Sequence, residues 1–364
     1  MTLFDGFLIK TENDEYSTWR RYGSLGSVRM SQAILANNSP AIAFALSVLR
    51  TKEIVALKNK IMESYRQAFK SPFLILLAVP GLITLFIFNY LPMYGVLLAF
   101  KDFDYSKGIW GSSWVGLKNF EYFLTSSQLF VVIRNTLLLN VAFIVSQTIA
   151  ALAIAVLLNE IRIKWFARLS QSVIFLPYFM SWIVVGMITQ SMLGGQNPTV
   201  NEWLIQLGLS EVNWYFEAHL WPWILSVIKV WHGAGYFAII YLAAITSIPE
   251  DLYEAAKIDG ASRFQAVRKI TLPLLIPTIS ILTLLLIGRI FNGDFAMIYA
   301  IVGDNSLLFP TTDVIDTYVY RSMRVLNDFG MSSAVGLFQS VMGLVLVLAV
   351  NSFVRRVSKE SALF

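Results

Sequence analysis

Residues 71–100 read SPFLILLAVPGLITLFIFNYLPMYGVLLAF and contain no charged side chain. A helix needs roughly 20 apolar residues to cross a hydrocarbon layer about 30 Å thick, so this run is long enough to span a membrane. Six such runs do not fit the core of a soluble domain, and the sequence therefore predicts an all-α integral membrane protein with six transmembrane helices. The five further runs lie at residues 136–159, 169–193, 221–245, 276–299 and 332–353.

The composition agrees with this fold class and excludes several kinds of site. Of the 364 residues, 56% are apolar and 14% are charged, against roughly 25% charged in an average soluble domain. Cysteine is absent and histidine occurs only as His219 and His232, which excludes a thiol nucleophile, a cysteine metal site and a multi-histidine metal centre. The formal net charge is +5, and the basic residues flank the apolar runs. We therefore expect membrane lipid, and not nucleic acid, as their partner.

The basic residues between the runs are distributed unevenly. Of the 28 Lys and Arg residues, 20 lie in residues 1–70, in the loops after the second and fourth runs, and in the C-terminal tail, whereas the opposite loops carry six. Because basic loops tend to stay in the cytoplasm, both termini are predicted to be cytoplasmic.

The regions outside the runs differ in character. Residues 1–50 are interpreted as an N-terminal extension and residues 357–364 as a C-terminal tail, on either side of a transmembrane domain at residues 71–356. Residues 51–70 carry apolar side chains on one helical face, which indicates an amphipathic helix on the inner membrane surface. A short helix against another subunit is the alternative. The apolar face consists of Ile54, Leu57, Ile61, Met62, Tyr65 and Phe69.

The loop between the fourth and fifth runs carries the strongest local signals. Ser247 with Glu250 has the spacing of a capping box, which starts a helix, and Ser262 with Gln265 repeats it. Gly260 permits the left-handed backbone conformation that ends a helix. The loop is therefore predicted to form two short helices, joined at the glycine and projecting into the cytoplasm.

Three segments of this loop carry a resemblance to a known family. Glu254-Ala255-Ala256, Asp259-Gly260-Ala261 and Ile270-Thr271-Leu272-Pro273 resemble the EAA signature of type I binding-protein-dependent ABC importer permeases. We call residues 246–275 the EAA loop.

The resemblance continues outside the EAA loop and covers about residues 71–364. Residues 114–120 and 231–249 are similar to the carbohydrate branch of the family. The segments 92–95 and 313–321, with the ending Leu363-Phe364, resemble the subgroup that imports polysaccharides and complex oligosaccharides, such as the permeases of alginate and aldouronate importers.

The resemblance implies the fold, the partners and a mechanism. It implies a type I permease fold in the bacterial cytoplasmic (inner) membrane, with a second, related permease, a dimer of ATPase subunits and an extracytoplasmic substrate-binding protein as partners. Closure of the ATPase dimer on ATP would move the EAA loops and open the permease core to the outside by alternating access. The residues expected to serve this contact are Glu254, Ala255, Ala256, Asp259, Gly260, Ala261, Arg263, Phe264, Leu272 and Pro273.

The chain itself is expected not to be an enzyme and to bind no cofactor. It contains no Gly-x-x-x-x-Gly-Lys-[Ser/Thr] phosphate loop and no Gly-Lys pair. ATP and Mg are therefore expected in the partner ATPase subunits.

Charged residues inside the runs are candidates for the path of a sugar. A charge at the bilayer centre costs about 2.5–3.5 kcal/mol on insertion scales, so such residues usually face a pathway or a partner. Lys229 lies in the fourth run and Arg289 and Asp294 lie in the fifth, where Arg289 and Asn292 are expected to share a helix face. A guanidinium would suit an acidic sugar. The alternatives are salt bridges for Arg289 and Asp294, within the bundle or to the other permease, and snorkelling for Lys229.

Aromatic and amide side chains inside the runs complete the candidate path, with simple packing as the alternative. The loops 194–220 and 303–330 are expected to face the binding protein or solvent. His232 is expected to serve packing or hydrogen bonding. The additional path candidates are Tyr178, Trp182, Gln190, Tyr236, Tyr299, Gln339 and Asn351.

Two other classes of protein compete with an importer permease. An ion-coupled secondary transporter would need broken half-helices in repeated positions, which the apolar runs do not predict. A membrane enzyme would need paired carboxylates, a histidine cluster or a nucleophile motif, and the sequence shows none in a common plane.

Overall fold

The computed structural model describes residues 72–195 and 198–357 and divides the chain into two units, residues 1–91 and 92–364. The predicted extension 1–50, the amphipathic helix 51–70 and the tail beyond residue 357 lie outside the described residues. In unit 1, the helix α4 (Pro72–Leu85) continues into a π-helical turn, η1 (Phe86–Tyr90).

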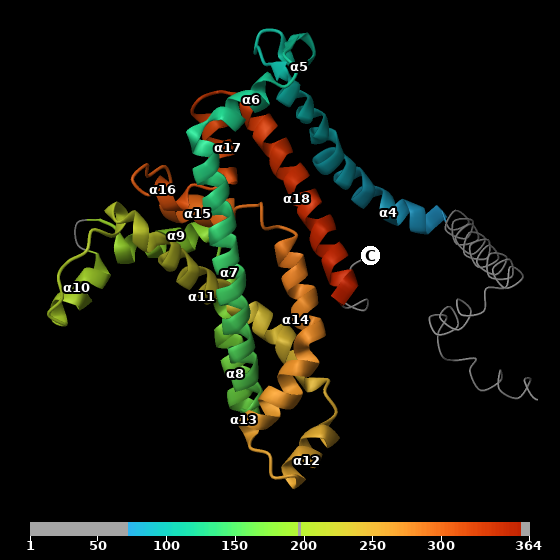
Figure 1. The fold of residues 1–364 in the computed structure, drawn as a ribbon, viewed down its shortest axis with the longest axis vertical. Helices are drawn as coiled ribbons and strands as arrows, with labels where there is room; N and C mark the ends of the chain where they lie inside the picture. The colour runs from blue at the N-terminus through green and yellow to red at the C-terminus, as the bar shows by residue number, and fades with distance from the viewer. Residues whose placement is uncertain (1–71, 196–197, 358–364) are drawn as a thin grey trace, which may run out of the picture. The chain divides into compact units, whose positions relative to one another are not determined.

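Among the residues of unit 2 that the structure describes, the regular elements are helices apart from one short antiparallel pair, β1 (Lys101–Asp102) with β2 (Ser113–Trp114). Figure 1 shows α12 and α13 at one end of this unit and α5, α6 and α17 at the other. The remaining elements are η2 (Leu91–Phe100), which begins at the unit boundary, α5 (Gly108–Gly111), α6 (Lys118–Thr125), α7 (Ser127–Asn159), α8 (Lys164–Phe175), η3 (Leu176–Phe179), α9 (Trp182–Leu193), α10 (Thr199–Gln206), η4 (Trp214–Phe216), η5 (Ala218–Leu220), α11 (Trp221–Thr246), α12 (Glu250–Ile258), α13 (Arg263–Ala266), η6 (Val267–Thr271), α14 (Leu272–Ile287), α15 (Phe295–Val302), α16 (Phe309–Thr312), α17 (Ile315–Arg324) and α18 (Phe329–Val357).

The predicted fold class, an all-α membrane protein, is confirmed. Within the described residues, five helical segments are long and apolar enough to cross a membrane, and a bent pair makes a sixth if it counts as one span. The five segments are Leu76–Phe100, Ser127–Asn159, Ala218–Thr246, Arg263–Ile287 and Phe329–Ser352.

The third predicted span, residues 169–193, is not one straight helix. Lys164–Phe179 and Trp182–Leu193 meet at an angle of 93°. Met180 and Ser181 are extended between them, and the Ser181 hydroxyl accepts a hydrogen bond from the Val184 N–H at 3.4 Å, which starts α9. Pro177 lies just before this point and removes one helical donor. Hydropathy shows the length of an apolar segment but not a change in the direction of its helix axis. The sequence therefore predicts residues 169–193 as one continuous span.

The fifth predicted span, residues 276–299, is also wrong in its bounds. Its helix begins at Arg263 and ends at Ile287, and residues 288–294 form turns before α15 begins. Arg289 and Asn292 therefore share no helix face. We call residues 288–294 the fifth-span break and residues 180–181 the third-span break. The expectation that the spans contain no broken helices was wrong.

The core of unit 2 is centred on α7 and α11, which pack against each other more extensively than any other pair of elements. Alanines at successive turns of the two helices are buried, which lets the backbones approach closely. Glycines serve the same purpose, because a Cβ at Gly235 would collide with the Ile174 carbonyl of α8. The buried alanines are Ala151, Ala155, Ala234 and Ala238.

We predict that Gly235→Ala lowers the free energy of unfolding by about 1–3 kcal/mol, because the added methyl group overpacks the contact between α11 and α8. Thermal unfolding of the detergent-solubilised protein measures the effect. Gly343→Ala is the matched control, since a Cβ there meets no atom within 4 Å. Equal stability of the two variants would contradict the close packing described here.

Candidate functional site

The EAA loop forms α12 as a separate short helix, as the sequence predicts, but α13 is not a second separate one. It continues through η6 into α14 as the single helical segment Arg263–Ile287. The predicted box at Ser247 and Glu250 is wrong, because Ser247 ends α11 and its hydroxyl donates to the Ala244 carbonyl at 2.7 Å. Pro249 precedes α12 with no side-chain cap. The second box is confirmed: Ser262 Oγ accepts from the Gln265 N–H at 3.3 Å, and Gln265 Oε1 accepts from the Ser262 N–H at 2.7 Å.

Gly260 joins the two helices in the left-handed conformation, with φ of 77°. Its N–H donates to the Lys257 carbonyl at 3.1 Å and the Ala261 N–H donates to the Ala256 carbonyl at 2.9 Å. These two bonds form a Schellman motif, which satisfies the last carbonyls of α12 and fixes the direction of the following chain. The predicted glycine turn is therefore confirmed.

Sequence reasoning missed two side-chain contacts, one that joins two parts of the EAA loop and one that ties the loop to α7. The Tyr253 hydroxyl and the Thr271 hydroxyl share a hydrogen bond of 2.9 Å, and Arg263 Nη1 lies 3.1 Å from Glu160 Oε2 at the end of α7. An open cleft of about 960 Å³ lies between the loop and the ends of α7 and α11. Both contacts join residues distant in sequence, so no local pattern indicated them.

Most of the predicted EAA residues lie on the surface of the loop. Ala256 and Ala261 are half-buried and the rest are exposed. Phe264 is 73% exposed, and the neighbouring Ile258, which sequence reasoning did not select, is 86% exposed. Apolar side chains this accessible on a loop otherwise rich in charge are typical of a protein-binding surface. The exposed predicted residues are Glu254, Ala255, Asp259, Gly260, Arg263, Phe264, Leu272 and Pro273.

An ion pair lies where the two breaks meet α11. Lys229 Nζ, about two turns into α11, lies 2.5 Å from Asp294 Oδ2, and each side chain is 23% exposed. Asp294 also precedes α15, where its Oδ1 accepts from the Met297 N–H at 3.4 Å. The salt-bridge alternative for Asp294 is thus realised within the chain, and Lys229 pairs with it. We call these two residues the Lys229–Asp294 pair.

A series of ring contacts connects the Lys229–Asp294 pair to further sequence candidates. Lys229 Nζ lies 5.4 Å from the centre of the Trp182 ring, and Trp182 stacks on His232 at 4.0 Å. Tyr178 stacks on Tyr236 at 4.6 Å and lies 5.9 Å from His232. His232 Nε2 forms a hydrogen bond of 3.0 Å with the Met180 carbonyl in the third-span break. Five of the sequence candidates are therefore close together: Tyr178, Trp182, Lys229, Tyr236 and Asp294.

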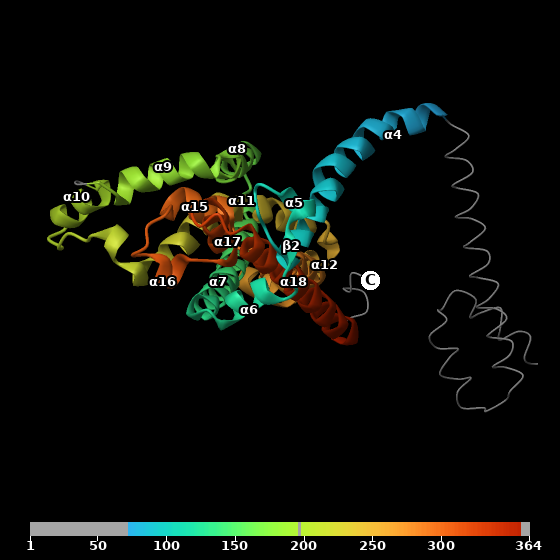
Figure 2. The ribbon, with the colours of Figure 1, turned by 90° about the horizontal axis from the view of Figure 1, so that it is seen from above.

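A cavity of about 1450 Å³ lies between α9 and α15, which run side by side (Figure 2). Within the described residues its lining contains no Lys, Arg, Asp or Glu. Burial raises the pKa of Tyr215 to about 12, so its hydroxyl stays a donor, to the Ile301 carbonyl at 3.1 Å. Aromatic walls with a few polar groups are typical of a small-molecule site. The lining includes Trp182, Gln190, Tyr215, Phe295, Tyr299 and Asn305.

The other sequence candidates do not join this cluster. Arg289 and Asn292 are exposed in the fifth-span break, and the Arg289 side chain has no partner among the described residues. Gln339 is buried, and its Nε2 donates to the Phe291 carbonyl at 2.8 Å and to Asp316 Oδ2 at 3.0 Å. Asn351 is buried near the far end of α18. Gln339 therefore supports the break and does not face the cavity.

Asp316 supports the same break from α17. Its Oδ2 accepts the Gly293 N–H at 2.5 Å as well as the Gln339 amide. Burial raises the pKa of the Asp316 carboxyl, and these two hydrogen bonds oppose that shift.

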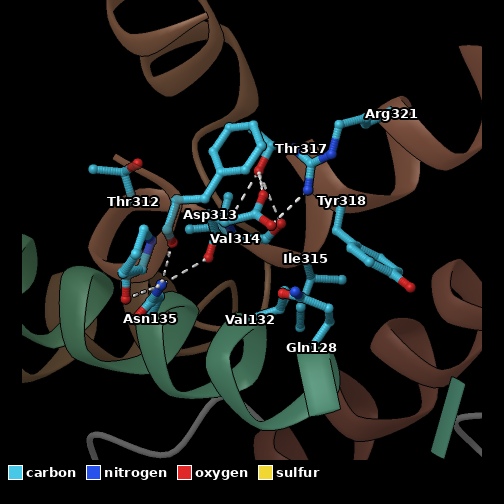
Figure 3. A network of polar contacts seen from close by, with 12 residues as sticks. Gln128, Val132, Asn135, Thr312, Asp313, Val314, Ile315, Thr317, Tyr318 and Arg321 are labelled. Atoms are coloured by element: carbon cyan, nitrogen blue, oxygen red, sulfur yellow. Dashed lines mark hydrogen bonds and ion pairs between the residues drawn. The ribbon is translucent and has the colours of Figure 1, made fainter. Parts of the chain in front are cut away.

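A buried polar network fixes the segment that follows α15. Figure 3 shows Asn135 of α7 beneath the loop and Asp313 beside Thr317 and Arg321. Asn135 Nδ2 donates to the Pro310 and Asp313 carbonyls, each at 3.2 Å, and Asp313 accepts from Thr317 Oγ1 at 2.8 Å and Arg321 Nη2 at 2.6 Å. Sequence reasoning missed this network, although the regular spacing of Asp313, Thr317 and Arg321 indicates one helical face.

The same segment joins the loop before α11. Asn305 Nδ2 donates to the Tyr215 carbonyl at 2.9 Å, and the Thr311 hydroxyl donates to the Ala218 carbonyl at 2.6 Å. The described parts of the two loops that were expected to face a binding protein, 194–220 and 303–330, therefore form one continuous surface.

The family described as "Binding-protein-dependent transport system inner membrane component" matches residues 147–359. The chain belongs to this family. It is a multi-pass inner-membrane permease, and the match includes the EAA loop, the Lys229–Asp294 pair and the cavity.

Named relatives and solved structures resemble the permease over most of its length. The polygalacturonan/rhamnogalacturonan transport system permease protein YteP of Bacillus subtilis (strain 168) is 33% identical over 307 residues, 84% of this chain and 95% of that protein. A chain of a bacterial ABC transporter involved in the import of the acidic polysaccharide alginate has a TM-score of 0.73 and 31% identity, covering 81% of this chain and 99% of that chain.

A second alginate transporter structure contains the periplasmic protein with an alginate pentasaccharide bound. Its matching chain has a TM-score of 0.72 and 31% identity, covering 81% of this permease and 98% of that chain.

We predict that Asp313→Asn destabilises the permease by about 3–5 kcal/mol, because it leaves the Arg321 guanidinium largely buried without its counter-ion. Thermal unfolding in detergent measures this loss. The double variant Asp313→Asn/Arg321→Gln should recover part of it, and the exposed Asp102→Asn is the control. A single variant as stable as the control would show that the network does not stabilise the fold.

Proposed function

We propose that this permease is one of two related permease subunits of an ATP-driven importer of acidic oligosaccharides. The observation that carries the proposal is the family match over residues 147–359, which includes an EAA loop whose apolar and charged side chains are exposed at one end of unit 2. A transport subunit without a phosphate loop needs a separate ATPase, so a pair of ATPase subunits binds ATP and Mg and contacts the EAA loop.

The saccharide class rests on the relatives and on the cavity between α9 and α15. YteP is described as a polygalacturonan/rhamnogalacturonan permease and the matching solved structures as alginate transporters. All three descriptions name uronate-containing polymers. The neutral aromatic and amide lining of the cavity suits a sugar ring. A substrate-binding protein delivers the sugar to the surface formed by loops 198–220 and 303–328.

The proposal that the substrate is acidic is also based on Arg289. A guanidinium in the fifth-span break with no partner among the described residues is available to bind an anion. A carboxylate of the second permease is the competing partner, and the experiment on Arg289 below separates the two.

An ion-coupled secondary transporter remains the second candidate, because the two breaks supply the broken helices that such a mechanism uses. Proteoliposomes distinguish the two. Uptake that follows an ion gradient in the absence of ATP would favour the secondary transporter, whereas the importer needs ATP and its binding protein.

We predict that Glu254→Lys or Asp259→Lys lowers oligosaccharide uptake per ATP hydrolysed at least tenfold, because each reverses a charge on the surface proposed to contact the ATPase. Uptake and ATP hydrolysis are measured together in proteoliposomes that hold the full complex. Glu121→Lys, the same change on the exposed face of α6, is the control. Normal coupling in both variants would reject the EAA assignment.

We predict that Arg289→Gln weakens uptake of tetragalacturonate about tenfold more than uptake of its methyl-esterified form, because charge-assisted hydrogen bonds contribute about 1.5–3 kcal/mol. Lys118→Gln, on α6, is the control. Equal losses for the two sugars would favour a salt bridge to the second permease instead.

A further inference from the structure

The Lys229–Asp294 pair adjoins the cavity at the point where its two walls begin. Lys229 Nζ lies over the ring of Trp182, and Asp294 directly precedes Phe295. Trp182 and Phe295 both line the cavity, which contains no charged side chain of its own within the described residues. Lys229 and Asp294 do not line the cavity themselves, but Lys229 lies against Trp182, a side chain of its wall.

Asp294 has two partners, and it can keep one when it loses the other. Its Oδ2 contacts Lys229 at 2.5 Å, while its Oδ1 accepts the Met297 N–H at the start of α15. The start of a helix stabilises a carboxylate through its free N–H groups and its dipole. Release of Lys229 therefore leaves Asp294 with a favourable environment, whereas Lys229 needs a new anion.

The pair is also only partly buried. Each side chain keeps 23% of its surface exposed. An anion can therefore approach Lys229 and replace Asp294 as its partner, so that the ammonium stays paired during the exchange. A fully enclosed pair would instead resist exchange.

We propose that Asp294 occupies, in the empty permease, the place that a uronate carboxylate takes on Lys229 when an acidic saccharide enters the cavity. Lys229 then determines specificity for acidic saccharides, and Asp294 keeps it neutralised between transport cycles. The proposal rests on the proposed function, and it adds the residue pair that reads the substrate charge.

Binding of tetragalacturonate to the solubilised permease–ATPase complex, without its binding protein, tests the exchange. Asp294→Asn removes the competing charge but retains a side chain that caps a helix equally well. It should tighten the Kd of tetragalacturonate about tenfold, and Lys229→Gln should weaken it about tenfold. The double variant should behave like Lys229→Gln. Methyl-esterified tetragalacturonate, which lacks the charge, should bind all four proteins alike.

The two single variants are expected to change the Kd of tetragalacturonate in opposite directions. This difference distinguishes exchange from a pair that is purely structural. If the pair only holds the helices together, both variants weaken binding of both sugars and the double variant restores it, which would overturn the proposal. If Asp294→Asn fails to assemble, Lys229→Arg tests the proposal instead. This variant keeps a cation, so it should prefer tetragalacturonate over the methyl-esterified sugar, whereas Lys229→Gln should lose that preference. Equal preference in these two variants would overturn the proposal as well.

The same binding measurements distinguish a failure of the proposed exchange from a failure of the proposed acidic-saccharide function. A wild-type complex that binds neither sugar, or binds both equally, contradicts the acidic-saccharide function and the exchange together. A wild-type complex that prefers tetragalacturonate, with both single variants weakened, contradicts the exchange alone.

Discussion

Hydrogen bonding of the backbone is the constraint on which this permease depends. In a hydrocarbon layer an unpaired N–H or C=O group costs several kcal/mol, so a helix can stop inside the membrane only where protein groups replace its lost bonds. Asn140 donates to the Ile290 and Asn292 carbonyls, at 3.0 and 3.2 Å, and Gln339 donates to the Phe291 carbonyl. Asp316 accepts the Gly293 N–H. The fifth-span break is therefore built by side chains from three different elements.

In the third-span break, too, side chains replace hydrogen bonds that the broken helix loses, but fewer side chains take part. His232 bonds the Met180 carbonyl, and Ser181 caps α9. These two breaks bring both Trp182 and Asp294 close to Lys229. The polar side chains that support the breaks stabilise the fold, and the resulting ion pair lies next to Trp182 and Phe295, which line the cavity.

The charges in and near the membrane consequently fall into three kinds. Asp313 and Arg321 form a pair in which the carboxylate is almost fully buried, and they stabilise a loop. Lys229 and Asp294 form a pair in which each side chain is 23% exposed, beside the wall of a cavity. Arg289 has no partner among the described residues. Burial and pairing distinguish these roles, because a pair closed to water resists exchange while an exposed cation without a partner can bind an external anion.

The sequence by itself determined the features that depend on neighbouring residues. Run length predicted the membrane class, and the Gly260 turn and the Ser262–Gln265 box followed from residues at most four apart. Only the tertiary structure decided the bends at residues 180–181 and 288–294, the contact of Lys229 with Asp294, and the reach of Asn135 to the loop after α15. Each of these joins groups far apart in the chain. Their pairing follows from the packing of α7 with α11, α9 and α15 around it, which no local pattern of residues encodes.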